Sequence, residues 1–172
     1  MPIAGPTDDR AAFVARYGGI YEHSPWVAEQ AYDDILRGAA RAEIGELLAS
    51  CVDRADRAAK LALIRAHPDL AGRAAVRGEL TDESSAEQRS AGIDRCTPDE
   101  YERFQMLNAA YKHKFGFPFV MAVRGRSRQE ILGAFEARVG NDPEREFETA
   151  IREIHKIARL RLSAVDDEER NA

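Results

Sequence analysis

The segment HPDLAGR, residues 67–73, places a histidine directly before a proline in a stretch that closes on a glycine. A proline disfavours the helical conformation in the residue before it, so His67 is predicted to be extended at a helix end, with its ring directed outward. An imidazole held in this way can act as a general acid or base near neutral pH. Asp69 is close enough to orient the ring or to cap the turn. The alternative is that His67 only caps the preceding helix.

A second polar group lies in the run SSAEQRSAGID, residues 84–94. Ser84 and Glu87 have the S-x-x-E spacing of a capping box, which predicts Ser84 as the N-cap of a helix and Glu87 as the residue that reaches back to it. Glu87 and Gln88 would then stand side by side in the first turn, where they could grip a polar ring rich in N–H and C=O groups. The capping role and the binding role both stay open.

An arginine is the third candidate. In the last predicted helix, apolar residues recur at helical spacing at Phe147, Ile151, Ile154 and Ala158. Arg161 returns to within about 20° of the same face. A buried guanidinium must pair with an internal carboxylate or bind a ligand, because an unpaired one is very costly. The alternative is that the side chain snorkels to solvent near the helix end.

The elements that must position these residues are predicted to be helices. Helix starts are indicated at Ser24-Pro25, at Thr97 with Glu100, at Ser127 with Glu130 and at Asp142-Pro143, and helix ends at Gly116 and Gly140. The apolar run FPFVMAV is the one strand-like stretch, and one such run cannot make a sheet. We expect an all-α, single-domain bundle of about six to eight helices over residues 1–172.

Two parts of that bundle are expected to depart from helix. The segment near residues 116–123 is predicted to be non-helical and apolar, and its unpaired backbone groups could recognise the edge of a flat heterocycle. The acidic tail, from about residue 166, is expected to fray.

Composition excludes several function classes. The 172 residues carry a net charge of −5, which gives no reason to expect nucleic acid. No stretch approaches the roughly 20 apolar residues of a membrane span, and the start lacks the order of a secretory signal, so a cytoplasmic protein is expected. The four histidines have no metal-binding spacing, and no metal is predicted. Cys51 is predicted to be a small buried hydrophobe.

Four motifs in order, HPDLAGR, SSAEQRSAGID, NAAYKHKFGFPFV followed by RG, and EIHKIARLRL, resemble the family of 2-oxo-4-hydroxy-4-carboxy-5-ureidoimidazoline (OHCU) decarboxylases. The resemblance runs from about Ala28 to Leu162. It implies an all-helical homodimer that converts this small ureidoimidazoline to (S)-allantoin and carbon dioxide in urate degradation, without metal or organic cofactor.

The resemblance also implies roles for residues that match the motifs. It implies His67 and Glu87 as catalytic residues, with His67 as the acid or base. It implies these substrate-binding residues: Pro68, which also sets the position of His67, together with Ser84, Gln88, Phe119, Val120, Met121 and Arg161.

Two rival functions stay open from the sequence. One is a non-catalytic helical module whose apolar segment and inward arginine bind a partner or an acidic metabolite. The other is an enzyme on the same scaffold that acts on a related ureido acid.

Overall fold

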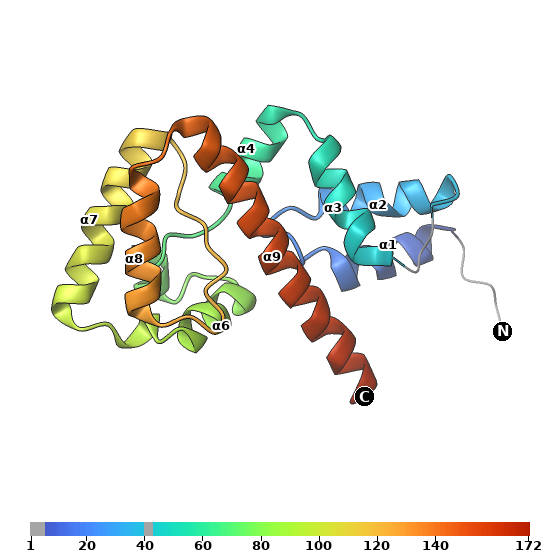
Figure 1. Cartoon of the computed structure of the whole chain (residues 1–172). Helices are drawn as coiled ribbons and strands as arrows, with labels where there is room; N and C mark the ends of the chain where they lie inside the picture. Colours follow the sequence, from blue (N-terminus) through green and yellow to red (C-terminus); the bar gives the residue numbers. More distant parts are fainter. Residues whose placement is uncertain (1–5, 40–42) are drawn as a thin grey trace. The chain divides into compact units, whose positions relative to one another are not determined.

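The computed structural model describes residues 6–39 and 43–172, and all regular structure within those ranges is helical (Figure 1). The helices are α1 (Pro6–Tyr17), α2 (Trp26–Leu36), α3 (Ile44–Arg54), α4 (Arg57–Arg65), α5 (Arg73–Arg77), α6 (Asp82–Ser90), the 3₁₀ turn η2 (Ile93–Arg95), α7 (Pro98–Phe115), α8 (Arg128–Val139) and α9 (Pro143–Arg170). The all-α prediction is confirmed. The described residues hold nine α-helices, above the expected range, and the five-residue α5 is too short to show an apolar stripe in the sequence.

The chain groups into two compact units. One unit runs up to Ala66 and includes His155–Ala172, and the other is His67–Ile154. The long helix α9 therefore supplies its first part to the second unit and the remainder to the first.

In the first unit, α2 packs against both α1 and α3. Its core is apolar and includes Val27, Leu48 and Val52. Cys51 is fully buried in this core, as predicted, but its thiol also contacts Asp34 and Arg54, each at 3.6 Å. The predicted cap of α2 is wrong: Pro25 occupies the cap position, and the Ser24 hydroxyl instead donates to the carbonyl of Glu22 at 2.8 Å.

In the second unit, α7 and α8 lie side by side (Figure 1). Both helices begin with the predicted capping boxes, formed by Thr97 with Glu100 and by Ser127 with Glu130. Gly116 ends α7 with φ of 76°, a left-handed conformation that glycine adopts without steric cost.

The apolar segment after α7 is non-helical, as predicted. Residues 117–123 contain no helix, and Phe117, Phe119, Val120 and Val123 are buried. The ring of Phe119 stacks on Phe135 of α8, with centroids 3.9 Å apart and ring planes 9° apart. Aromatic burial therefore fixes this segment against α8.

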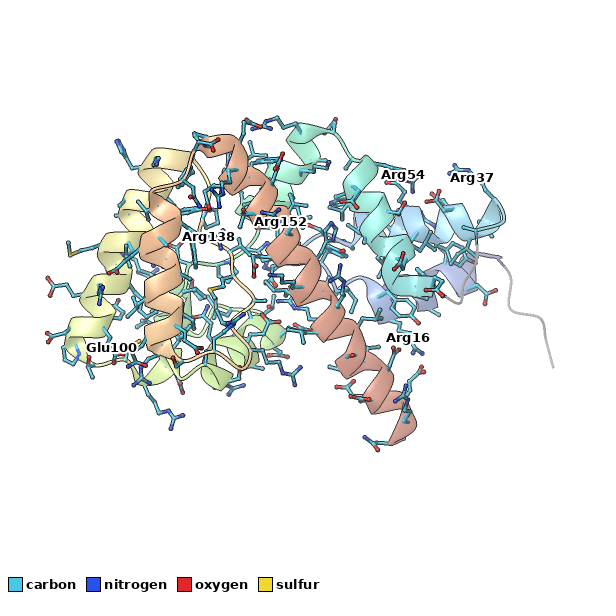
Figure 2. The ribbon with its side chains drawn as sticks, in the orientation of Figure 1. Arg16, Arg37, Arg54, Glu100, Arg138 and Arg152 are labelled. Atoms are coloured by element: carbon cyan, nitrogen blue, oxygen red, sulfur yellow. The ribbon has the colours of Figure 1, made fainter. Side chains whose placement is uncertain are left out.

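The acidic tail, expected to fray from about residue 166, belongs to a helix in the structure. Helix α9 continues to Arg170. Within the first unit, Arg16 of α1 forms ion pairs with Asp166 and Glu169 of α9, so acidic residues of the tail have a cationic partner (Figure 2 labels Arg16). Acidic side chains at the end of a chain can therefore belong to a helix when a basic residue of another helix forms ion pairs with them.

Candidate active site

His67 follows the end of a helix, as its proline predicts. Helix α4 ends at Arg65, and Ala66 is the cap residue, whose N–H donates to the carbonyls of Ala62 and Leu63. Because backbone groups of Ala66 close this helix end, the termination of α4 does not require a cap from His67. His67 is buried, with an exposed fraction of 7%. A buried ring of this kind has a restricted position, which acid–base catalysis requires.

The loop that follows His67 is held by side chains of two helices. Its backbone is bound at three successive residues, because the carbonyls of Asp69, Leu70 and Ala71 each accept a hydrogen bond from a side-chain amide. The donors are Gln88 of α6 at 3.3 Å to Asp69, Asn108 of α7 at 2.9 Å to Leu70, and Gln105 of α7 at 2.7 Å to Ala71. We call residues 67–72 the histidine loop.

Two further contacts complete the attachment of the histidine loop. The N–H of Ala71 donates to Gln88 Oε1 at 3.1 Å, so Gln88 binds the loop through both ends of its amide. Lys112 of α7 donates from Nζ to Asp69 Oδ2 at 2.6 Å. The carboxylate of Asp69 is therefore bound by a lysine of α7, and this bond attaches the loop to that helix.

The backbone of the histidine loop adopts a demanding conformation. Ala71 has φ of 52°, a left-handed value that costs a residue with a Cβ about 1–3 kcal/mol. A Cβ at Gly72 would lie 2.7 Å from the Cβ of Asp69, a distance that two such atoms do not reach. The glycine of HPDLAGR is thus required for the close approach of the two sides of the turn.

Helix α6 starts three residues earlier than the S-x-x-E pattern predicts. Thr81 is its N-cap, and the Thr81 hydroxyl accepts from the N–H of Ser84 at 3.2 Å. The predicted capping box of Ser84 with Glu87 is therefore wrong, because Ser84 is already inside the helix. Thr81, followed by two acidic residues, was the signal for the true cap.

The correct start places the polar residues of α6 on different parts of the helix. Ser84 and Gln88, four positions apart, are both buried, with exposed fractions of 4% and 5%. Glu87 is half-buried. Glu87 and Gln88 thus lie in the second turn of α6, and Gln88 binds the histidine loop.

The apolar segment meets a second set of polar contacts. Arg138 of α8 donates from Nη1 to the carbonyl of Val120 at 2.8 Å, and its guanidinium carbon lies 4.3 Å from the centre of the Phe119 ring (Figure 2). Glu153 of α9 accepts from the N–H of Ala122 at 2.9 Å. Some of the backbone groups that were predicted to bind a ligand, such as the carbonyl of Val120, are therefore already bound by side chains of the protein.

A buried charge cluster supports Arg138. Glu146 of α9 is fully buried and accepts from Arg138 Nε at 3.0 Å, from Asn141 Nδ2 at 2.8 Å and from the Tyr111 hydroxyl at 2.5 Å. Burial, followed by the hydrogen bond to Glu146, raises the pKa of Tyr111, so its hydroxyl remains a donor. Arg138 and Glu146 were missed from the sequence because neither lies in a motif with a recognisable spacing.

Arg161 belongs to the first unit and is buried, with an exposed fraction of 6%. Its Nη2 lies 2.7 Å from Oε2 of Glu22, itself buried, and its Nη1 donates to the carbonyl of Gly19 at 3.3 Å. The alternative that this side chain snorkels to solvent is wrong, and the predicted internal carboxylate is Glu22. Glu22 could not be identified as that partner from local spacing.

The sequence also missed the role of three α7 residues. Asn108 binds a carbonyl 38 residues away in the chain. Gln105 and Lys112 share this face of α7, since residues at i, i+3 and i+7 align along a helix. A stripe of polar side chains with this spacing, next to the buried Phe104 and Tyr111, was the available signal.

The described residues also bear on membrane and metal binding. None of the helices in the described ranges is both long and apolar enough to cross a membrane. The same ranges contain no group of three or more His, Cys, Asp or Glu side chains arranged to hold a metal ion.

The helical fold and the histidine loop define a class of small all-α enzymes, and comparisons with known proteins identify the family. The sequence profile described as OHCU decarboxylase matches residues 6–163, which spans both compact units. The chain belongs to this family, and its activity class is that of a carboxy-lyase. The resemblance found in the four motifs is thereby confirmed.

Individual relatives agree with the family match. The chain is 45% identical over 155 residues to the 2-oxo-4-hydroxy-4-carboxy-5-ureidoimidazoline decarboxylase of Haloferax volcanii, covering 90% of this chain and 89% of that protein. It is 36% identical to the protein of the same name in Mus musculus, covering 90% of this chain and 86% of that one. Among solved structures, a crystal structure of (S)-allantoin synthase superposes with a TM-score of 0.71 at 34% identity, covering 93% of this chain and 51% of that chain.

Proposed function

We propose that this chain converts 2-oxo-4-hydroxy-4-carboxy-5-ureidoimidazoline to (S)-allantoin and carbon dioxide as a step of urate degradation. The observation that carries the proposal is the histidine loop, in which a buried imidazole begins a turn bound by four side chains of α6 and α7. Family membership supports the substrate, and the loop supports the presence of a proton-exchanging group in a fixed position.

The substrate carries its own electron acceptor. Its carboxylate and hydroxyl share one ring carbon, and the neighbouring carbon, which bears the ureido group, belongs to a C=N bond. When the bond to the carboxylate breaks, its electron pair forms a C=C bond between these two carbons, and the C=N pair moves to nitrogen, which takes a proton. Loss of the hydroxyl proton then gives the carbonyl of allantoin, while a proton adds to the ureido-bearing carbon. No external electron sink is required.

The protein must therefore hold the ring, exchange protons and protonate one face. In our proposal His67 exchanges a proton with the substrate hydroxyl and promotes loss of the carboxylate. Glu87 fixes the hydroxyl and ureido groups. Since each end of the Gln88 amide already binds the loop, the second proton on its Nε2 is the one proposed to reach the substrate.

The remaining proposed contacts are for binding. Ser84 and Pro68 line the substrate beside His67, and Phe119, Val120 and Met121 form the wall that meets the ring.

Arg161 binds a carbonyl or the carboxylate of the substrate in addition to its pairing with Glu22. This last role is tested separately by Arg161→Lys, which keeps the charge but loses the planar fork and should raise KM about 10-fold or more.

The experiment generates the substrate in place, from urate with urate oxidase and hydroxyisourate hydrolase, and follows circular dichroism with and without the protein. We expect rapid formation of optically active allantoin together with stoichiometric carbon dioxide. Glu87→Gln should slow this reaction at least about 10-fold while the melting temperature stays near that of the wild type. Racemic allantoin at the spontaneous rate would exclude the proposed function.

We further propose a homodimer, as the resemblance implies, located in the cytoplasm, as the sequence pattern predicts. The net charge of −5 supports a water-exposed protein. Light scattering coupled to size-exclusion chromatography should give twice the chain mass of 19.1 kDa. A mass of one chain at micromolar concentration would contradict the dimer without bearing on the reaction.

A further inference from the structure

We propose that Gln105, Asn108 and Lys112, on one face of α7, are positioning residues that hold the histidine loop in the conformation that presents His67. The proposal rests on the proposed function for its effect on turnover. Its structural part, the effect on the position of the His67 ring, can be measured without any activity.

The first support is that α7 binds the histidine loop at three residues. Gln105 donates to the Ala71 carbonyl at 2.7 Å, Asn108 to the Leu70 carbonyl at 2.9 Å and Lys112 to the Asp69 carboxylate at 2.6 Å. One helix face thus binds three consecutive residues of the loop, whereas a single bond would satisfy only one isolated carbonyl. Such a register fixes both the height and the rotation of the loop along α7.

The second support is the strained backbone that these bonds hold in place. Ala71 has φ of 52°, and its carbonyl is bound by Gln105 while its N–H is bound by Gln88. Strained backbone persists where the surroundings determine it from several sides. Without the α7 contacts, the turn is free to relax toward an ordinary conformation.

The third support is the short and stiff path from the clamped residues to the imidazole. Only Pro68 separates His67 from Asp69, and the proline ring fixes its own φ near −65° while restricting the residue before it. A change in the position of Asp69 is therefore passed on to His67 with little freedom to absorb it.

The fourth support is that Asn108 is a poor choice for stability alone. It is 95% buried, and its Oδ1 accepts no hydrogen bond from the part of the chain that the structure describes. A buried acceptor left without a donor is destabilising, and an apolar side chain of similar shape would avoid that cost. The amide is thus explained by the Leu70 carbonyl that its Nδ2 binds.

The chain offers a matched control on the same helix. Lys114 of α7 donates to the carbonyl of Val139 at the end of α8 and to that of Asn141 in the loop after it, both at 2.7 Å, and does not touch the histidine loop in any bond that we describe. Lys112→Ala and Lys114→Ala therefore each remove an exposed lysine from α7 and its bonds to a loop. They differ in which loop is released.

The experiment measures kcat, KM and the His67 signal in histidine-labelled NMR spectra, assigned with a His67→Gln sample. We expect Gln105→Ala and Asn108→Ala to lower kcat about 10-fold or more with KM changed less than about 2-fold, because misplacing a proton-exchanging group affects the reacting step. Lys112→Ala should lower kcat about 2- to 5-fold, and Lys112→Arg should restore it. Lys114→Ala should leave kcat unchanged.

The NMR spectra separate failure of this proposal from failure of the proposed function. In the Gln105→Ala and Asn108→Ala proteins the His67 signal should shift and broaden while those of His23 and His155 stay in place. If the wild type has no decarboxylase activity, the function is wrong and the His67 signal alone decides on positioning. Should Asn108→Ala fail to fold, Gln105→Ala and Lys112→Ala decide. An unchanged His67 signal in these variants, or an equal loss of kcat in Lys114→Ala, overturns the proposal.

Discussion

The histidine loop and the apolar segment are two non-helical stretches of the second unit, and they are held mainly by different kinds of contact. Amide side chains and one lysine bind the polar groups of the histidine loop, so hydrogen-bond geometry fixes it. The apolar segment is fixed by burial of Phe117, Phe119 and Val120 and by stacking on Phe135.

This difference indicates a division of tasks between the two regions. Hydrogen bonds to neutral amides contribute only about 0.5–1.5 kcal/mol each but define positions to fractions of an ångström. Buried aromatic side chains contribute several times as much per residue and tolerate adjustment by repacking. We infer that the apolar segment supplies mainly stability and the histidine loop mainly geometry.

The largest expected effect tests the stability side of the comparison. Glu146→Ala leaves Arg138 beneath the apolar segment without its carboxylate, and breaking a buried ion pair from one side costs about 3–5 kcal/mol. We expect a large drop in the urea midpoint of unfolding. Glu148→Ala, at an exposed position of the same helix, should change the midpoint little, and an equal drop in both would show that the buried pair is not the cause.

An intermediate effect tests the geometry side. Gly72→Ala places a Cβ 2.7 Å from that of Asp69, so the turn must open, at a cost of about 1–3 kcal/mol. Because His67 lies on this turn, kcat should fall by more than the loss of folded protein explains. Activity and thermal unfolding of the same sample give the two quantities.

Gly133→Ala is the control for that change. Gly133 lies inside α8, and a Cβ there meets no atom within 4 Å, so alanine should stabilise the helix by about 0.5–1 kcal/mol. If Gly72→Ala were as harmless as Gly133→Ala, the tight turn would not be needed for the position of His67.

The smallest expected effect is on a residue outside both regions, Glu100, and concerns the pH dependence of stability. The N–H of Thr97, and after it the guanidinium of Arg128, holds the pKa of Glu100 below its usual value. A carboxyl with a lowered pKa in the folded state adds stability above its unfolded pKa, and this contribution is lost as pH falls through the folded value. The melting temperature of Glu100→Gln should therefore lie slightly below that of the wild type at pH 7 and approach it as the pH falls through the lowered pKa of Glu100. A gap that widens on acidification would contradict this sign.

The sequence predicted the helical elements better than it predicted their polar contacts. Capping boxes such as Thr97 with Glu100 act within four residues, so the chain itself contains the whole signal. The start of α6 was misplaced because two overlapping polar patterns fitted, and only the structure shows that Thr81 rather than Ser84 accepts the bond.

Predictions for the site divide along the same line. Of the two predictions for Arg161, exposure to solvent was wrong and burial was confirmed, because helical spacing alone places that residue on the inward face. The partners of the histidine loop come from residues 17 to 43 positions away, and no local pattern encodes such pairings. The roles of the predicted site residues in binding and catalysis remain predictions that the experiments above address.

The most direct test of the account is the rate of (S)-allantoin formation by His67→Gln, measured by circular dichroism with substrate generated in place. The account predicts a folded protein, with a melting temperature within a few degrees of the wild type, whose product is racemic and forms at the spontaneous rate. If His67→Gln still formed (S)-allantoin at a rate near that of the wild type, the histidine loop would not be the catalytic element, and the central claim would be wrong.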